Sequence, residues 1–340
     1  GSTNPLDQKL VAYTGGDAAD TSSWVFSVNL TSNSAAYQFV LYKPLDHNDA
    51  GNDASLSIRF TVNATDRDGD VVQQTFEIDV ADSSPTGGAG TTAWLNDDTL
   101  SGGNPGDASN GDHGLANTNN FVKFNFGADG PGSIAWTGIS VTGGGNAADF
   151  SSLPSNGGKT LEVFQNGKLV ITATLNPVTG AYSLTQNAPI SHIAGGQENE
   201  VQFKFHYSVT DGDGDTAPGY IWVNVDDDTP IATSPVADGV VSDVAPGGAV
   251  ALAVNSLNIS WGADKAGSVQ FASTDIKDTL GNALSSGGVD LKYAVIAADG
   301  STNPLDQKLV AYTGGDAADT SSWVFSVNLT SNSAAYQFVL

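Results

Sequence analysis

The strongest constraint on this chain is an internal repeat in which 41 consecutive residues occur twice. Residues 1–41 recur without a change as residues 300–340, at an offset of 299 residues. We interpret the chain as a window of a longer array with a repeating unit of 299 residues, because both cuts fall inside apparent domains. An artificial duplication is the alternative. The array interpretation predicts that neighbouring identical repeats of the same long chain are its partners.

A weaker repeat divides this unit into two homologous domains. Residues 56–85 and 201–230 share alternating apolar positions, an acidic loop and a final proline when Asp66 is aligned with Asp211. The expected boundaries follow from this alignment: the C-terminal part of one repeat domain in residues 1–85, a complete domain in residues 86–230, and the N-terminal part of the next domain in residues 231–340.

Apolar residues alternate with polar or small residues through much of the chain, which is the pattern of half-buried strands. Clear examples are residues 24–30, 56–62, 169–175 and 201–209. Asn166-Gly167, between two such runs, is typical of a tight hairpin turn. Seven or more short strands in a domain of about 150 residues predict an all-β fold of tandem immunoglobulin- or cadherin-like β-sandwich domains. Without any Cys, these domains would have no disulfides.

Composition excludes several classes of function. The chain carries 37 acidic against 12 basic residues and a formal net charge of -25, which argues against a nucleic-acid partner. No apolar run approaches the length of a membrane span, so we expect no membrane insertion in this segment. Neither a Cys nucleophile nor a Gly-x-Ser-x-Gly elbow is present, and we expect no enzymatic activity. The four histidines, His47, His113, His192 and His206, show no metal-binding spacing.

Two acidic loops carry the strongest chemical signal. Each has the form Asp-x-Asp-Gly-Asp, and together they contain Asp66, Asp68, Asp70, Asp211, Asp213 and Asp215. Three carboxylates at alternate positions repel one another unless a cation lies between them, and Ca²⁺ prefers oxygen ligands of this kind. A solvated acidic turn without metal is the alternative. An EF-hand is excluded, because loop position six is Val71 in one loop and Thr216 in the other.

Further acidic residues are candidate calcium ligands at bends and domain junctions. Asp129 and Asp264 each end a Gly-Ala-Asp sequence, and they are either ligands or ordinary turn residues. A run of three carboxylates, Asp226, Asp227 and Asp228, precedes a proline at the predicted junction, and Asp82 occupies the matching position in the other domain. A cation held there would stiffen the linker, whereas a solvated acidic linker is the alternative.

The Gly-Ala-Asp strand ends, the Asp-x-Asp-Gly-Asp loops and the Asp-Asp-x-Pro exit resemble the extender repeats of large type I secreted bacterial adhesins. These are the repeats-in-toxin biofilm adhesins, with related VCBS-type and cadherin-like modules. The resemblance covers most of the chain and implies secretion, a location at the bacterial cell surface, and rigid extension that depends on calcium. By resemblance, the six aspartates of the two loops would be calcium ligands.

The expected function is therefore that of a calcium-rigidified stalk segment in an extracellular adhesin that mediates surface attachment or biofilm formation. One alternative is a self-assembling surface filament or sheath, in which copies of the chain exchange strands. Another is a glycan-binding sandwich that uses exposed aromatic residues such as Trp94 or Trp222.

Overall fold

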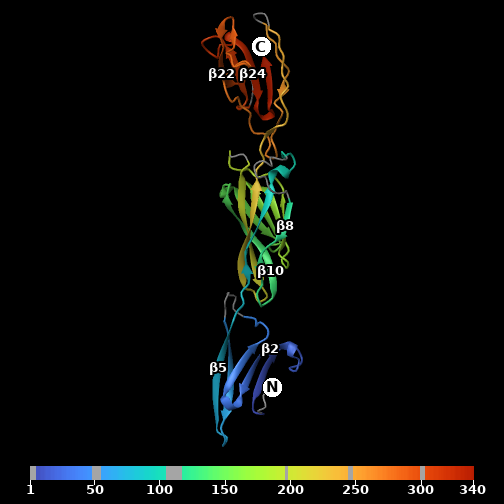
Figure 1. The fold of residues 1–340 in the computed structure, drawn as a ribbon, viewed down its shortest axis with the longest axis vertical. Coiled ribbons are helices and arrows are strands. Elements are labelled where there is room, and N and C mark those ends of the chain that lie inside the picture. Colours follow the sequence, from blue (N-terminus) through green and yellow to red (C-terminus); the bar gives the residue numbers. More distant parts are fainter. Residues whose placement is uncertain (1–4, 48–54, 105–116, 196–197, 244–247, 299–302) are drawn as a thin grey trace. The chain divides into compact units, whose positions relative to one another are not determined.

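The computed structural model describes residues 5–47, 55–104, 117–195, 198–243, 248–298 and 303–340. Strands dominate these ranges (Figure 1), so the predicted all-β class is confirmed. The helices described are 3-10 turns of three residues each: η1 Thr21–Ser23, η2 Ser32–Ser34, η3 Asp97–Thr99, η5 Ala147–Asp149, η6 Thr320–Ser322 and η7 Ser331–Ser333. None of these described helices has the length and apolarity that a bilayer crossing requires.

The middle of the chain forms two antiparallel sheets. One has four strands in the order β10 (Pro131–Gly143), β15 (Glu200–Asp211), β16 (Thr216–Asp226) and β7 (Ala89–Asn96). The other has five strands in the order β11 (Phe150–Ser155), β12 (Thr160–Gln165), β13 (Lys168–Leu175), β14 (Ala181–Gln186) and β8 (Asn117–Phe121). A short antiparallel pair is formed by β6 (Thr86–Gly87), which precedes β7 in the chain, and β9 (Phe124–Asn125), which precedes β10.

Aromatic side chains pack the two sheets face to face. Trp136 of β10 is 2% exposed and meets Tyr182 of β14 edge-on, with ring centroids 6.1 Å apart. Phe150 of β11 meets Phe203 of β15 at 5.0 Å in the same manner. Each of these pairs joins one sheet to the other, which makes this region a β-sandwich with a dry aromatic centre.

The long β15–β16 hairpin follows directly from the sequence pattern. Every second side chain of β15 is buried, from Val201 to Val209, and the same alternation continues through Ile221, Val223 and Val225 of β16. This alternation fixes the register of the hairpin, because a slip of one residue would turn all the apolar side chains outward. The predicted turn at Asn166-Gly167 is also confirmed, with positive φ angles of 49° and 80° between β12 and β13.

The N-terminal region contains a small sheet and a long hairpin. The sheet has the order β1 (Gln8–Tyr13), β2 (Trp24–Thr31) and β3 (Ala36–Leu41), and the hairpin pairs β4 (Ser55–Thr65) with β5 (Val71–Ala81). Phe26 of the sheet meets Phe60 of the hairpin at 6.0 Å, so the two layers touch through aromatic rings. A groove of about 680 Å³ remains between them, lined by residues that include Leu10, Leu30 and Phe76.

The C-terminal region contains a five-stranded sheet in the order β18 (Asn255–Ser256), β25 (Ala335–Val339), β24 (Trp323–Thr330), β23 (Gln307–Tyr312) and β22 (Lys292–Ala297). Two short pairs accompany it, β17 (Ile231–Ala232) with β19 (Ile259–Ser260) and β20 (Ser285–Ser286) with β21 (Val289–Asp290).

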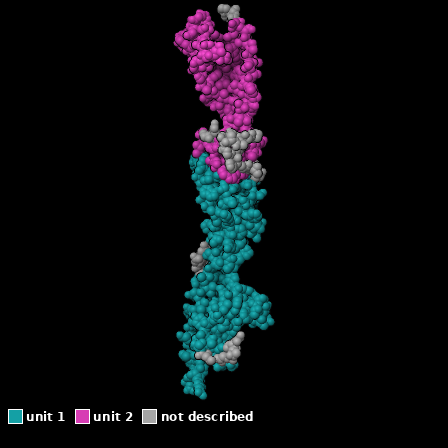
Figure 2. Space-filling model, in the orientation of Figure 1, with its two compact units in different colours: residues 1–93, 117–185, 202–224 teal, residues 94–116, 186–201, 225–340 magenta. Residues whose placement is uncertain are grey.

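The contacts divide the chain into two compact units (Figure 2). Unit 1 comprises Gly1–Ala93, Asn117–Thr185 and Gln202–Asn224, and unit 2 comprises Trp94–Ala116, Gln186–Val201 and Val225–Leu340. These units cut across the three segments expected from the internal repeat. The repeat-derived boundaries at residues 85 and 230 therefore stay a prediction.

The duplicated sequence adopts the same three strands in both places but in different surroundings. In unit 1 the strand β1 pairs only with β2 among the described strands, and Leu10 is 52% exposed. In unit 2 the identical strand β23 lies between β22 and β24, and the equivalent Leu309 is 2% exposed. Identical sequence therefore forms identical strands, while the burial of those strands depends on what pairs with them.

Candidate metal centres

Loop 1, residues 66–70, connects β4 to β5, and its backbone forms hydrogen bonds with the side chain of its first aspartate. The Asp66 N–H donates to the Asp70 carbonyl oxygen at 3.0 Å, and Asp66 Oδ1 accepts from the backbone N–H groups of Gly69 and Asp70. Gly69 has a φ of 102°, which favours glycine at this position. All three carboxylates are exposed, and each offers one oxygen within 4.8 Å of the others.

Loop 2, residues 211–215, connects β15 to β16 and repeats this backbone geometry. The Asp211 N–H donates to the Asp215 carbonyl oxygen at 3.1 Å, and Asp211 Oδ1 accepts from Gly214 and Asp215. Gly214 has a φ of 112°. The surroundings differ, because Asp211 is only 3% exposed and Asp215 only 4% exposed.

A close backbone contact accounts for part of this burial. Gly212 lies against the main chain of Asp129, so that a Cβ at position 212 would collide with the Asp129 carbonyl oxygen. Loop 1 has Arg67 at the corresponding position. Glycine in loop 2 therefore lets the bend at Asp129 approach, and the approach brings the Asp129 carboxylate to the acidic loop.

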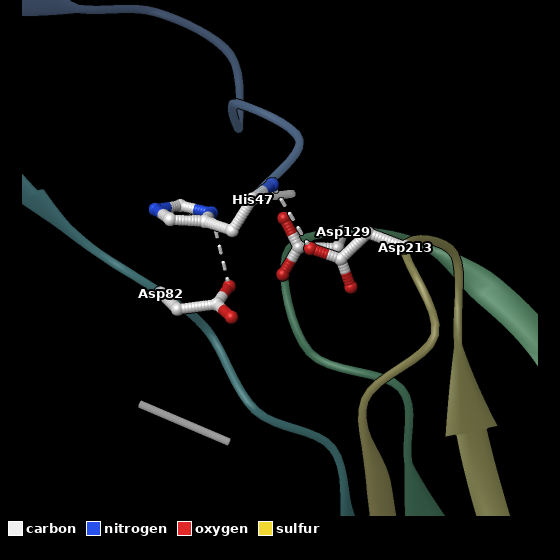
Figure 3. Close-up of side chains that lie close together, drawn as sticks. All are labelled: His47, Asp82, Asp129 and Asp213. Carbon is white, nitrogen blue, oxygen red and sulfur yellow. Dashed lines mark hydrogen bonds and ion pairs between the residues drawn. The ribbon is translucent and has the colours of Figure 1, made fainter. Parts of the chain in front are cut away.

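Four side chains from four separate segments converge beside loop 2 (Figure 3). His47 follows β3, Asp82 follows β5, Asp129 precedes β10, and Asp213 lies in loop 2. His47 Nδ1 is 3.2 Å from Asp82 Oδ1, and the backbone N–H of His47 donates to Asp213 Oδ2 at 3.3 Å. These four residues can each offer one ligand atom within 4.8 Å of the others, and Asp213 also belongs to the loop 2 group.

Several buried polar atoms in this region have no hydrogen-bond partner among the described residues. On the carboxylates they are Asp82 Oδ2, Asp129 Oδ2, Asp211 Oδ2, Asp213 Oδ1 and Asp215 Oδ2. The Asp82 side chain is fully buried. Leaving a buried carboxylate oxygen without a partner costs free energy, and a divalent cation is the partner that satisfies several such oxygens at once.

Burial also changes the proton affinity of these carboxyl groups. It raises the pKa of Asp211 and Asp129, and it raises the pKa of Asp215 to about 6 with a further contribution from Asp82. In loop 1 the direction is reversed: hydrogen bonding with the Asp68 side chain, then with the Asp70 backbone, lowers the pKa of Asp66. Within loop 2, burial therefore disfavours the ionised forms of Asp211 and Asp215, whereas the pKa of Asp213 is lowered, with hydrogen bonding from the His47 backbone favouring its ionised form.

A second cluster lies in unit 2 and contains Asp97, His192 and Asp227. His192 Nε2 is 3.7 Å from Asp97 Oδ2 and 3.9 Å from Asp227 Oδ1. Burial, opposed by His192, raises the pKa of Asp97 to about 6 and that of Asp227 to about 7, and the charge of Asp264 raises both further. This cluster therefore combines one imidazole with carboxylates in a buried environment.

The remaining predicted ligands lie near this second cluster, but one of them already has backbone partners. Asp228 is 3% exposed, and its carboxylate accepts the N–H of Asn104 at 3.3 Å and the N–H of Ala263. Asp226 is buried at the end of β16. Of the run of three carboxylates, only Asp227 thus joins a group with metal-binding spacing.

Two of the histidines lie in carboxylate clusters, which the spacing of the histidines along the chain did not predict. His47 and His192 lie in the two carboxylate clusters, whereas His206 bonds with Ser140 Oγ at 2.9 Å and His113 lies outside the described residues. A signal for the two clustered histidines was present: they are 145 residues apart, the same offset that relates Asp66 to Asp211. The alignment of acidic positions alone missed it, and it missed Asp97 as well.

One of the two aromatic residues named for glycan stacking, Trp222, has protein partners. Trp222 is half-buried, with Lys204 Nζ 4.7 Å from its ring centroid and the Tyr220 ring at 5.6 Å. Nothing in this arrangement favours a glycan platform over ordinary packing on the outer face of a sheet.

Comparison with known proteins gives one family. A family described as Domain of unknown function (DUF5801) matches residues 95–221, which lie inside the predicted complete domain. No curated protein matches the chain. The family match supports a recognisable domain in the sandwich region and assigns no activity to it.

Proposed function

We propose that this chain is a calcium-stabilised extender segment of a repetitive extracellular bacterial adhesin. The observation that carries the proposal is a set of five buried carboxylate oxygens at and beside loop 2 that have no hydrogen-bond partner among the described residues, one each from Asp82, Asp129, Asp211, Asp213 and Asp215. Oxygen ligands in this number are what Ca²⁺ requires, with backbone carbonyls or water completing six to eight. The internal 299-residue repeat supports the role of a spacer.

In this function calcium acts mechanically. The ion replaces repulsion between carboxylates by attraction to a common centre, and it ties the segment after β5, the bend before β10 and the tip of the β15–β16 hairpin to one point. A linker held at both sides by an ion bends less than a free one. The binding of extracellular calcium at this site therefore makes unit 1 stiffer.

The same chemistry suits a protein that is exported unfolded. Weak extracellular sites, with dissociation constants of about 10⁻⁴–10⁻³ M, fill outside the cell and stay free of calcium in the cytoplasm. Secretion and a surface location are part of this proposal, and they rest on the resemblance of the acidic motifs to type I secreted adhesins.

Thermal unfolding with and without calcium tests the proposal. At calcium concentrations about 100 times the dissociation constant, one ion adds about 2.7 kcal/mol to the free energy of unfolding. For a domain of this size, that raises the melting temperature by about 5–10 °C. Melting that is unchanged by EGTA, with no calcium bound in equilibrium dialysis, would contradict the proposal.

A further inference from the structure

We propose that Asp97, His192 and Asp227 form a binding site in unit 2 for a first-row transition-metal ion of the Zn²⁺ type, chemically distinct from the calcium site. This inference goes beyond the extender function and does not depend on it. It starts from a histidine that the acidic motifs leave unexplained.

The distances around His192 are unsuited to direct hydrogen bonds. Its Nε2 lies 3.7 Å from Asp97 Oδ2 and 3.9 Å from Asp227 Oδ1, whereas a charge-assisted N–H···O bond is about 2.7–2.9 Å long. Two ligand atoms on a tetrahedral zinc ion, with Zn–N and Zn–O bonds of about 2.0–2.2 Å, lie about 3.3–3.5 Å apart. The observed separations exceed this spacing by a few tenths of an ångström, which side-chain rotation can close.

Burial makes the imidazole costly without a ligand. The His192 side chain is 1% exposed, and neither ring nitrogen has a hydrogen-bond partner among the residues that the structure describes. Asp97 is fully buried and Asp227 has a side-chain exposure of 14%. A buried polar ring whose nitrogens make no hydrogen bond destabilises the fold, and a metal ion bound to it removes that penalty.

The two carboxylates are held in place by neighbouring groups. The Ile190 N–H donates to Asp97 Oδ2 at 2.8 Å, and the Gln186 side-chain amide donates to Asp97 Oδ1. The Asp228 N–H donates to Asp227 Oδ1 at 2.9 Å. Such outer contacts orient carboxylate ligands and leave a second lone pair on each oxygen for an ion.

The donor set selects the class of metal. Calcium takes six to eight oxygen ligands, whereas imidazole nitrogen favours Zn²⁺ and its neighbours in the first transition row. Zinc accepts both imidazole nitrogen and carboxylate oxygen as ligands, and a site with three protein ligands leaves the fourth position to water. The charge of Asp264 acts on both Asp97 and Asp227. This additional negative charge favours the binding of a dication at the cluster.

The internal repeat supports the pairing of His192 with Asp227. Both residues recur 145 positions earlier as His47 and Asp82, where His47 Nδ1 lies 3.2 Å from Asp82 Oδ1. There the other ring nitrogen of His47 lies 3.1 Å from the Val80 carbonyl oxygen, a contact that directs Nδ1 at the carboxylate. The His–Asp pair is therefore a feature of both repeats.

Metal titration of the whole chain tests the proposal. With calcium present in saturating amounts, Zn²⁺ is titrated by calorimetry into the wild type, His192→Gln and the matched control His206→Gln. We expect the wild type and the control to bind one zinc equivalent at least tenfold more tightly than His192→Gln does. Equal zinc isotherms for wild type and His192→Gln would overturn the proposal, and so would zinc uptake that releases calcium in equal amount.

A measurement on the wild type guards against a variant that fails to fold. In ¹⁵N-histidine spectra of the wild-type chain, zinc should shift the ring nitrogens of His192 by tens of parts per million; unshifted His192 signals would refute the site. The calcium proposal is read from the same samples by melting with EGTA. Its failure leaves the zinc result intact, and a failed zinc site leaves the calcium result intact.

Discussion

Loop 1 and loop 2 have the same acidic motif and the same backbone hydrogen bonds, yet their side chains lie in opposite environments. The carboxylates of loop 1 are exposed, whereas Asp211 and Asp215 of loop 2 are 3% and 4% exposed. The motif alone therefore does not define a buried cation site. Beside loop 2, His47, Asp82 and Asp129 come from other segments of unit 1 and form a second group that shares Asp213 with the loop.

The Asp-x-Asp-Gly-Asp motif therefore preorganises only its own aspartates. The other side chains of a cluster must come from neighbouring segments. Both loops turn their first aspartate onto their own backbone, which leaves the second oxygen of that residue for an ion. Among the described residues of the two loops, only those of loop 2 have buried carboxylate oxygens without a hydrogen-bond partner.

The largest expected effect comes from removing paired charges in each loop. Asp211→Asn with Asp215→Asn should abolish the calcium-dependent rise in melting temperature of about 5–10 °C. The matched variant, Asp66→Asn with Asp70→Asn, should retain it, because surface substitutions change stability by about 0.5 kcal/mol or less. Differential scanning calorimetry in calcium and in EGTA measures both. Equal losses in the two variants would mean that the loops are equivalent despite their burial.

The next effect concerns the residue after the first aspartate. Gly212→Ala should destabilise the chain by about 1–3 kcal/mol, because the new methyl group collides with the Asp129 carbonyl oxygen. Arg67→Ala in loop 1 is the control, and it should be nearly neutral. Urea unfolding of both variants in calcium gives the comparison. A neutral Gly212→Ala would show that the bend at Asp129 is not held against loop 2.

A smaller effect is expected from a ligand outside the loop. Asp82→Asn should weaken calcium binding about tenfold, which corresponds to about 1.4 kcal/mol, because a neutral amide replaces a buried carboxylate. Asp79→Asn, three residues earlier on the exposed face of β5, should leave the affinity unchanged. Calcium calorimetry on both variants decides the matter. If Asp82→Asn binds as the wild type does, loop 2 acts without the segment that follows β5.

The smallest effect is a difference in pH dependence. Burial raises the pKa of Asp215 to about 6, above the unfolded value of about 3.9, so in EGTA this group favours folding as the pH falls from about 7 toward 4. The pKa of Asp66 is lowered, so its contribution is lost only below about pH 4. In EGTA, melting temperature should rise by a few degrees on acidification from pH 7 to 5. In calcium it should fall, because protons compete with the ion. The same slope in both buffers would contradict this assignment.

The local sequence pattern was sufficient to predict the strands and turns of this chain. It was not sufficient to predict which residues form the candidate sites. Alternation predicted β15 and β16, and Asn166-Gly167 predicted its hairpin, because these depend on neighbours along the chain. Burial does not depend on them alone, as Leu10 and Leu309 demonstrate: the same residue in the same 41-residue sequence is 52% exposed in one place and 2% in the other.

The sites combine residues that no local window contains. Loop 2 was predicted from its aspartates, but its junction with His47 and Asp82 depends on the packing of distant segments. The cluster at His192 depends in the same way on Asp97, which lies more than 90 positions earlier, directly after β7. Only the 145-residue offset shared by His47 and His192 carried that information in the sequence.

The long sequence separation within the loop 2 site has a kinetic consequence. Asp82 and Asp213, two of the proposed calcium ligands, are 131 positions apart, so an ion between them closes a long loop, and we expect this contact to form late in folding. Interactions that are absent from the folding transition state slow unfolding without accelerating folding. Calcium should therefore lengthen the lifetime of the folded segment and leave its folding rate unchanged, which gives a stretched chain resistance to force over time.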